Sequence, residues 1–208
     1  MKEQIEISCI GVSYVQPILE LYWKLSNEKF TGNSKIRVSS MENGYSASIV
    51  ALTAFCIESL LNNLKYHKKY YDRYALSFLR RKYPKYAELA EDLNELFTLR
   101  NIIAHNYIWK IEYEFDDKYN EINIRKQLQN GYGNRDFNNV IDEVNKVTKK
   151  LRLRIIPTRI GINEAKQALL LLKSFSDFLD EVGYRYISNP YFDYIKKPRK
   201  FKEIISLI

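Results

Sequence analysis

A short segment near the middle of the chain gathers residue types that can act on a phosphodiester. Between Leu99 and Tyr107 it carries Arg100, Asn101 and His105, and the whole chain has only two histidines. A guanidinium can neutralise charge that grows on a phosphorane, and an imidazole can move a proton because its unperturbed pKa lies near neutral pH. An amide beside them can orient the imidazole or a phosphate oxygen. The pattern makes metal-independent RNA cleavage the leading hypothesis.

The elements that position these residues are read from the apolar spacing. Pro84 and an acidic run behind it precede apolar residues at helical spacing, which predicts a helix over 85–108. Each residue of a helix turns by about 100°, so Asn101 and His105 share a stripe while Arg100 points about 140° away from His105. One helix therefore does not gather every group around one phosphate. Two copies placed face to face across a two-fold axis would do so, and we expect a homodimer.

The rest of the chain is predicted to be mainly α-helical. We expect a strand over 4–15, helices over 17–30, 47–66 (capped by Ser46 or Ser48), 136–151 and 163–182 (ended by Gly183), loops over 31–45 and 131–134, and a β-hairpin from Trp109 to Ile124. This is an antiparallel helical bundle with a β-hairpin inserted after the motif helix. One domain is expected over 1–208: an N-terminal extension (1–45), core helices (46–108), a hairpin insertion (109–160), a late core helix (161–183) and a basic C-terminal tail (184–208).

Composition narrows the class of protein. Hydrophobic residues make up 46% of the 208 residues and charged residues 28%, which excludes a disordered chain, and the 7 Gly and 5 Pro argue against a turn-dense sandwich. The net charge of +8 indicates an anionic partner, of which nucleic acid is the commonest, although a merely solubilising basic surface is an open alternative. Cys9 and Cys56 lack metal-ligand spacing and indicate a reducing compartment, so no metal and no cofactor is expected. With no secretory signal and no run of about 20 apolar residues, we expect a cytoplasmic protein without a membrane partner.

A basic, aromatic stretch from Lys65 to Lys85 is the second candidate for an RNA contact. It holds eight Lys and Arg against one acid, Asp72, interleaved with tyrosines. Such a stretch can track a phosphate backbone while tyrosines stack on bases, but it is equally consistent with a solvated helix face whose tyrosines pack inward. The candidate RNA-binding residues are Lys65, Lys68, Lys69, Arg73, Arg80, Arg81 and Lys82. His67, among these lysines, is expected at the surface and outside the chemistry.

Each motif residue also has a structural interpretation. Glu58 lies in the middle of the apolar helix over 47–66, where a carboxylate is costly unless it is paired. Arg100 could be that partner across the bundle, a pairing that is compatible with catalysis. His105 could instead be a hydrogen-bonded core histidine, and Tyr107 could be one more packing tyrosine.

The motif Arg100-Asn101-x-x-x-His105-x-Tyr107 resembles the Arg-x(4–6)-His signature of HEPN domains. The resemblance covers about residues 46–108 and 160–183. It implies a helical bundle that pairs through its motif helices and often acts as a metal-independent ribonuclease in toxin–antitoxin or phage-defence systems, while some members only bind RNA, nucleotide or a protein partner.

By this resemblance, Arg100, Asn101 and His105 are the catalytic residues, with Glu58 and Tyr107 in support. The 2′-hydroxyl of the RNA would attack the adjacent phosphorus, giving a 2′,3′-cyclic phosphate and a 5′-hydroxyl. In a subset paired with a nucleotidyltransferase antitoxin, the tyrosine that matches Tyr107 receives nucleotides. An antitoxin or another defence-system protein is therefore an expected partner.

Overall fold

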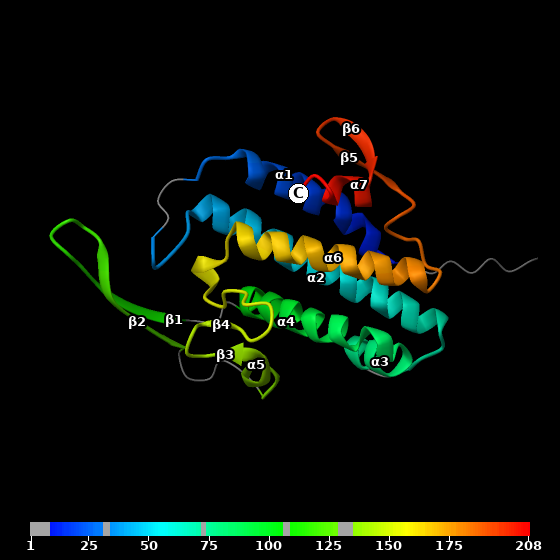
Figure 1. Ribbon diagram of the computed structural model, residues 1–208, viewed down its shortest axis with the longest axis horizontal. Helices are drawn as coiled ribbons and strands as arrows, with labels where there is room; N and C mark the ends of the chain where they lie inside the picture. The colour runs from blue at the N-terminus through cyan, green and yellow to red at the C-terminus, as the bar shows by residue number, and fades with distance from the viewer. Residues whose placement is uncertain (1–8, 31–33, 72–73, 106–108, 129–134) are drawn as a thin grey trace, which may run out of the picture.

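The computed structural model describes residues 9–30, 34–71, 74–105, 109–128 and 135–208, and it shows a mainly helical protein with small antiparallel strand pairs (Figure 1). In chain order the elements are η1 (Gly11–Tyr14), α1 (Val15–Asn27), α2 (Ser40–His67), α3 (Ala75–Lys82), η2 (Pro84–Tyr86), α4 (Ala87–Ala104), β1 (Trp109–Phe115), β2 (Glu121–Leu128), α5 (Arg135–Val140), β3 (Ile141–Asp142), β4 (Val147–Thr148), η3 (Pro157–Arg159), α6 (Ile162–Glu181), β5 (Tyr191–Tyr194), β6 (Lys197–Lys200) and α7 (Phe201–Ile205).

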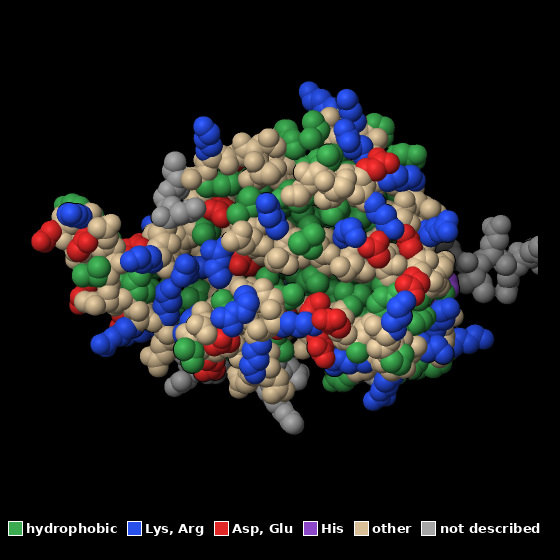
Figure 2. Space-filling view, in the orientation of Figure 1, with side chains coloured by type: hydrophobic (Ala, Val, Ile, Leu, Met, Phe, Trp, Pro, Cys, Tyr) green, Lys and Arg blue, Asp and Glu red, His purple; other side chains and the backbone are tan. Residues whose placement is uncertain are grey.

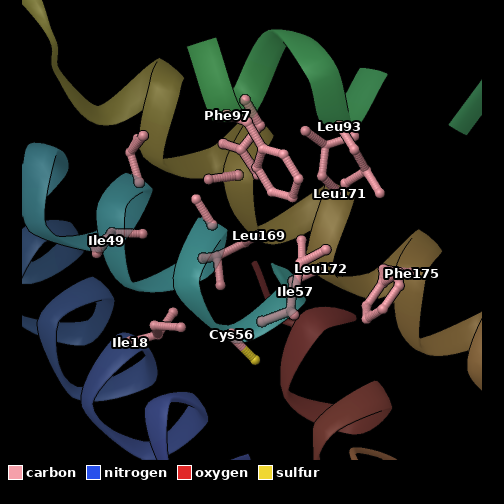
Figure 3. Packing of buried hydrophobic residues seen from close by; sticks show 14 of the residues in the cluster. Ile18, Ile49, Cys56, Ile57, Leu93, Phe97, Leu169, Leu171, Leu172 and Phe175 are labelled. Carbon is pink, nitrogen blue, oxygen red and sulfur yellow. The ribbon is translucent and has the colours of Figure 1, made fainter. Parts of the chain in front are cut away.

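Helix α2 is the centre of the bundle and packs against α1, α4 and α6. Figure 3 shows the resulting core, in which side chains of α2 such as Ile49 and Ile57 meet Ile18 of α1 and Leu169 of α6, all fully buried. The expectation that no segment is apolar enough to cross a membrane is wrong for α2, which passes by length and composition. Half of its most apolar stretch is buried inside the protein, as its central place among three helices requires.

The first turns of α2 correct the expected start of this helix. It begins at Ser40, with the Ser39 hydroxyl accepting a hydrogen bond from the Glu42 amide at 3.2 Å, and neither Ser46 nor Ser48 caps it. The predicted loop over 31–45 is therefore partly helical. Its polar residues are satisfied by distant backbone: Glu42 accepts from the Ile162 amide at 3.1 Å, and the Asn43 amide donates to the Pro157 carbonyl at 2.7 Å.

The N-terminal region belongs to the core, which corrects its assignment as an extension. Residues 4–8 lie outside the described residues, and the described part of the strand predicted over 4–15 is instead η1 leading into α1. Gly11 explains the close packing, because a Cβ at this position would lie 2.7 Å from Leu60 Cγ. The helix that follows buries Val15, Ile18, Leu19, Tyr22 and Leu25 at helical spacing.

The two other long helices have nearly the predicted bounds. Helix α4 ends at Ala104, with His105 as its C-cap, while the rest of the predicted helix, 106–108, lies outside the described residues. Helix α6 ends at Glu181 with Val182 as its C-cap, and Gly183 follows as predicted with a φ of +89°, which suits glycine. The Tyr184 amide donates to Leu179 O and the Gly183 amide to Asp180 O, which is the hydrogen-bond pattern of a Schellman C-cap.

The region after the motif helix combines a confirmed and a wrong prediction. The hairpin is present as antiparallel β1 and β2, which extend from the body of the molecule (Figure 1). The helix predicted over 136–151 is wrong beyond Val140, because a turn follows in which both carboxylate oxygens of Asp142 accept hydrogen bonds from Asn145. That turn pairs β3 with β4.

The C-terminal segment is folded onto the bundle, so its description as a tail is corrected. Strands β5 and β6 pair in antiparallel register, and β5 contacts α1. Helix α7 contacts α6 and buries Phe201 and Ile204 completely. The basic residues of the C-terminal segment, between Lys196 and Lys202, therefore belong to a segment that is packed on the bundle.

Candidate functional site

The predicted site residues lie on the last turns of α4. The His105 amide donates to the Asn101 carbonyl at 2.9 Å, so the helical stripe continues up to the C-cap. Asn101 and His105 are both exposed. The alternative in which His105 is a core histidine is therefore excluded, and its imidazole is open to a ligand.

The sequence left two roles open for Arg100, an ion pair with Glu58 and a part in catalysis, and the structure shows how its guanidinium is bound. Its Nη1 donates to Glu58 Oε2 of α2 at 3.0 Å, and its guanidinium carbon lies 5.3 Å from the centre of the Phe55 ring and 5.8 Å from that of Phe97. The arginine side chain is 16% exposed and the Glu58 side chain 39%. The Arg100 Nε is buried with no hydrogen-bond partner within the described residues. The predicted Glu58–Arg100 pairing is thus present, and the guanidinium still has unused donor capacity.

A groove of about 800 Å³ runs along Arg100 and Asn101. Glu58 of α2, Arg80 of α3 and Val140 of α5 line its other sides. His105 is not among the lining residues, so within one chain the guanidinium and the imidazole open to different surroundings.

The far wall of the groove was missed by the sequence interpretation. Glu95 accepts hydrogen bonds from the backbone amides of Lys150 at 2.8 Å and Leu151 at 2.7 Å, which fixes the segment after β4 against α4. Lys150 itself binds Asp92 at 2.8 Å; burial lowers its pKa, but Asp92 and Glu88 outweigh that effect and the net pKa is raised. This wall was not recognised from the sequence because one helix was predicted over 136–151. The only sign of it in the sequence was the basic pair Lys149 and Lys150.

The side-chain amides of Asn94 and Asn139 are the other feature of the groove that the sequence interpretation did not single out. Asn94 and Asn101 of α4 face it together with Asn139 of α5, and Leu76 and Phe97 supply apolar surface. Amides and apolar surface together suit the edge and face of a nucleobase. The arrangement can therefore hold a flat polar group beside the Arg100 guanidinium.

The predicted basic stretch does not form one continuous face. Lys65 is buried, with 8% exposure, whereas Lys68 and Lys69 are exposed beyond the end of α2. Arg80, Arg81 and Lys82 are exposed on α3, and of the candidates only Arg80 lines the groove. Arg73 lies outside the described residues, as does Tyr107 of the motif.

The tyrosines of this stretch divide between the two interpretations. Tyr70 stacks on Phe78 with ring centres 5.0 Å apart, and Tyr83 packs on Phe178 at 5.2 Å, as in an inward-packed face. Tyr66, Tyr71 and Tyr74 are instead exposed, and Tyr74 lines the groove. Exposed aromatic surface is thus present beside Arg80.

Within the described ranges, no cluster of three or more His, Cys, Asp or Glu side chains could hold a metal ion. The absence of a metal or cofactor in the chemistry stays a prediction. Comparison with protein-family models, with curated proteins and with solved structures gave no match.

Proposed function

We propose that the protein is a HEPN-like endoribonuclease that cleaves RNA without a metal ion and acts as a homodimer. The observation that carries the proposal is the end of α4, where an exposed His105 follows an exposed Asn101 by one turn, on the same helix as Arg100. These three groups supply a proton carrier, an orienting amide and a cation, which are what attack by a 2′-hydroxyl requires.

In the proposed reaction, the substrate's own 2′-hydroxyl attacks the adjacent phosphorus and the bond to the 5′-oxygen breaks. His105 moves the proton, either from the attacking hydroxyl or to the leaving oxygen. Arg100 stabilises the charge of the phosphorane with the exposed part of its guanidinium that Glu58 does not occupy. Asn101 orients the imidazole or a phosphate oxygen. The products are a 2′,3′-cyclic phosphate and a 5′-hydroxyl, and DNA is left intact because it lacks the attacking group.

The homodimer follows from the different exposure of the two groups. Arg100 opens into the groove, whereas His105 lies past the groove at the helix end. A second copy, with its α4 face to face with the first, would bring the imidazole of one protomer to the guanidinium of the other. A toxin or anti-phage setting, with an antitoxin or defence-system partner, is part of the proposal through the resemblance alone, as is modification of Tyr107.

A non-catalytic module that binds RNA, nucleotide or a protein partner is the second candidate. The ion pair between Arg100 and Glu58 favours it, because a guanidinium already held by a carboxylate has less charge to offer a phosphate. The two candidates differ in whether bound RNA is cleaved.

The experiment compares the only two histidines of the chain. Single-stranded RNA and DNA of one sequence are incubated with the wild type, His105→Ala and His67→Ala in the presence of a chelator. We expect the wild type to cleave RNA and not DNA. The cleavage rate should fall at least about 100-fold in His105→Ala. It should stay at the wild-type level in His67→Ala, because His67 is an exposed residue at the C-terminal end of α2 and is not part of the motif.

The chemistry and the assembly have separate readouts in the same experiment. Mass spectrometry of the fragments should show 2′,3′-cyclic phosphate ends, and the activity per molecule should rise with protein concentration when two copies form the site. Intact RNA at high protein concentration, or equal cleavage by His105→Ala, would refute the nuclease and leave the binding module.

A further inference from the structure

Lys126 and Arg159 flank one chain segment, away from the groove, where the β1–β2 hairpin joins the body of the protein. The segment 34–38 contacts both regions: Lys126 Nζ donates to the Lys35 carbonyl at 3.2 Å, and the Val38 amide donates to the carbonyl of Thr158, the neighbour of Arg159, at 3.0 Å. Figure 2 shows Lys and Arg side chains gathering between the hairpin and the body. We call Lys126 and Arg159 the hairpin-base pair.

The acids near the hairpin-base pair have other partners. Glu164 accepts two hydrogen bonds from the Arg154 guanidinium, at 2.6 and 2.9 Å. Glu42 accepts from the Ile162 amide at 3.1 Å, and Glu121 accepts from the Lys35 amide at 2.6 Å. No ion pair joins any of these carboxylates to Lys126 or Arg159 within the described part of the chain.

The surroundings of both cations disfavour their charged forms. The Arg159 Nε is buried and has no hydrogen-bond partner in the described structure. Burial lowers the pKa of Arg159, and the charge of Arg154 lowers it further; burial and then the charge of Arg159 lower the pKa of Lys126. Glu121 offsets these effects only in part. An anion bound to the exposed part of the Arg159 guanidinium and to the Lys126 ammonium would offset the positive charge that both residues experience.

A phosphodiester fits this site because a guanidinium edge and an ammonium can share its two unesterified oxygens. The site is also within reach of the motif. Trp109 begins β1 four residues after His105, a separation of at most about 14 Å between Cα atoms, and Ile111 pairs with Lys126 across the hairpin. One short strand of RNA can therefore touch both.

We propose that Lys126 and Arg159 bind a backbone phosphate of the RNA strand on which the motif acts. This inference rests on the proposed function for the identity of the strand, but not on cleavage. It assigns the hairpin base a role in holding substrate, and it adds a phosphate-binding site that neither the motif nor the basic stretch provides.

The test measures binding where cleavage is removed. In a His105→Ala background, a labelled single-stranded RNA is titrated by fluorescence anisotropy with the parent, with Lys126→Gln/Arg159→Gln, and with Lys197→Gln/Arg199→Gln as a control of equal charge on β6. We expect the hairpin-base variant to bind at least about tenfold more weakly, as the removal of hydrogen bonds to a charged group predicts. Its slope of log K against log salt should flatten by about 0.7 for each phosphate that the variant no longer binds, while the control changes both quantities far less.

Thermal unfolding separates this role from a structural one and RNA from a free phosphate. Because the hairpin-base variant lacks two cations that repel each other, it should unfold at the same temperature as its parent or higher; a lower temperature, with RNA binding unchanged, would overturn the proposal. Stabilisation of the parent by inorganic phosphate without any RNA binding would also overturn it, in favour of a small-anion site. Weakened RNA binding together with uncleaved RNA in the wild type would refute the nuclease and leave this inference standing.

Discussion

At the scale of single residues, Arg100 carries both the packing and the chemistry of the motif. Its stem and guanidinium lie between Phe55 and Phe97, and Glu58 fixes one of its terminal nitrogens. A cation held in this way has already given up its rotamer freedom, so it needs little further ordering to meet a phosphate. The same interactions make any simple truncation of Arg100 ambiguous, because packing is removed together with charge.

Two matched substitutions separate these effects. Arg100→Met keeps an unbranched apolar stem between the two rings, and Glu58→Gln keeps the shape of its side chain; each removes the ion pair. Because Glu58 is 39% exposed, we expect each to lower the free energy of unfolding by no more than about 1 kcal/mol in urea titrations. RNA cleavage should disappear only in Arg100→Met. Equal loss of cleavage in Glu58→Gln at unchanged stability would show that the carboxylate takes part in the reaction.

The sequence predicted some of the interactions of the site and missed others, and the reasons are physical. A carboxylate within an apolar helix favours a cationic partner, so the pairing of Glu58 with Arg100 could be proposed from the sequence, although the Glu58 side chain is in fact 39% exposed. The groove wall made by Lys149, Lys150 and Asn139 could not, because it depends on Glu95 binding backbone amides more than fifty residues away in the chain. The hairpin-base pair was missed for the same reason: the chain segments that meet there are distant in sequence.

At the scale of elements, long apolar helices were predictable and their polar ends were not. The core stripes of α1, α4 and α6 are visible in the sequence because packing repeats them every three or four residues. The start of α2 was placed too late because Glu42 and Asn43 resemble loop residues, and only the segment before α6 supplies their partners. In the described part of the strand predicted over 4–15, the chain instead forms η1, in which Gly11 packs against Leu60.

Helix α7 offers a test of how the last element is held. Lys202 binds Asp177 at 2.9 Å and Asp180 at 3.1 Å on α6, and both carboxylates together raise the pKa of Lys202. Burial raises the pKa of Asp177, but its hydrogen bonds from Lys173 and Lys202 outweigh that effect and the net pKa is lowered. An aspartate with a lowered pKa stabilises the fold above its unfolded pKa of about 3.9, and this contribution is lost as the pH falls through the folded pKa.

We therefore expect Lys202→Met to destabilise the protein near neutral pH by less than about 1 kcal/mol, since Lys202 is about half exposed. The difference between variant and wild type should shrink as the pH falls below about 4, where Asp177 of the unfolded chain becomes protonated, and should vanish below the lowered pKa of Asp177 in the folded protein. Urea titrations at a series of pH values measure it. A difference that stays constant down to the lowest pH would mean that Lys202 acts through its packing on α6 and not through its charge.

At the scale of the whole molecule, the chain is a helical core with a projecting hairpin (Figure 1). Helix α2 packs against three helices, and the hairpin pairs with itself outside this core. The proposed RNA-binding positions lie at the end of α4 and at the base of the hairpin. The HEPN-like arrangement and the homodimer stay predictions, to which the assembly readout of the nuclease experiment applies.

Cys56 reports on the cooperativity of this core. It is fully buried in α2 beside the packing of η1, and burial, followed by the charge of Cys9, raises its pKa to about 12. The thiolate is the reactive form, so the native thiol should be inert at pH 8. In a Cys9→Ser background, labelling by an aromatic disulfide should be at least about 1,000-fold slower than in urea-unfolded protein. The logarithm of the labelling rate should rise with urea concentration with the slope that is measured for global unfolding.

The Cys56 thiol also predicts how the stability of the fold changes at alkaline pH. An acid whose pKa is raised in the folded state stays protonated there while the unfolded chain ionises, so stability should fall as the pH rises above about 8.5. Cys56→Ala in the Cys9→Ser background removes the part of that loss that begins at about pH 8.5, although it lowers stability at all pH values through the cavity it leaves. Absorbance of the released thiol and circular dichroism against urea measure the two effects. Labelling of the native protein without urea at the unfolded rate would mean that α2 opens locally beside η1, and the bundle would then not unfold as one unit.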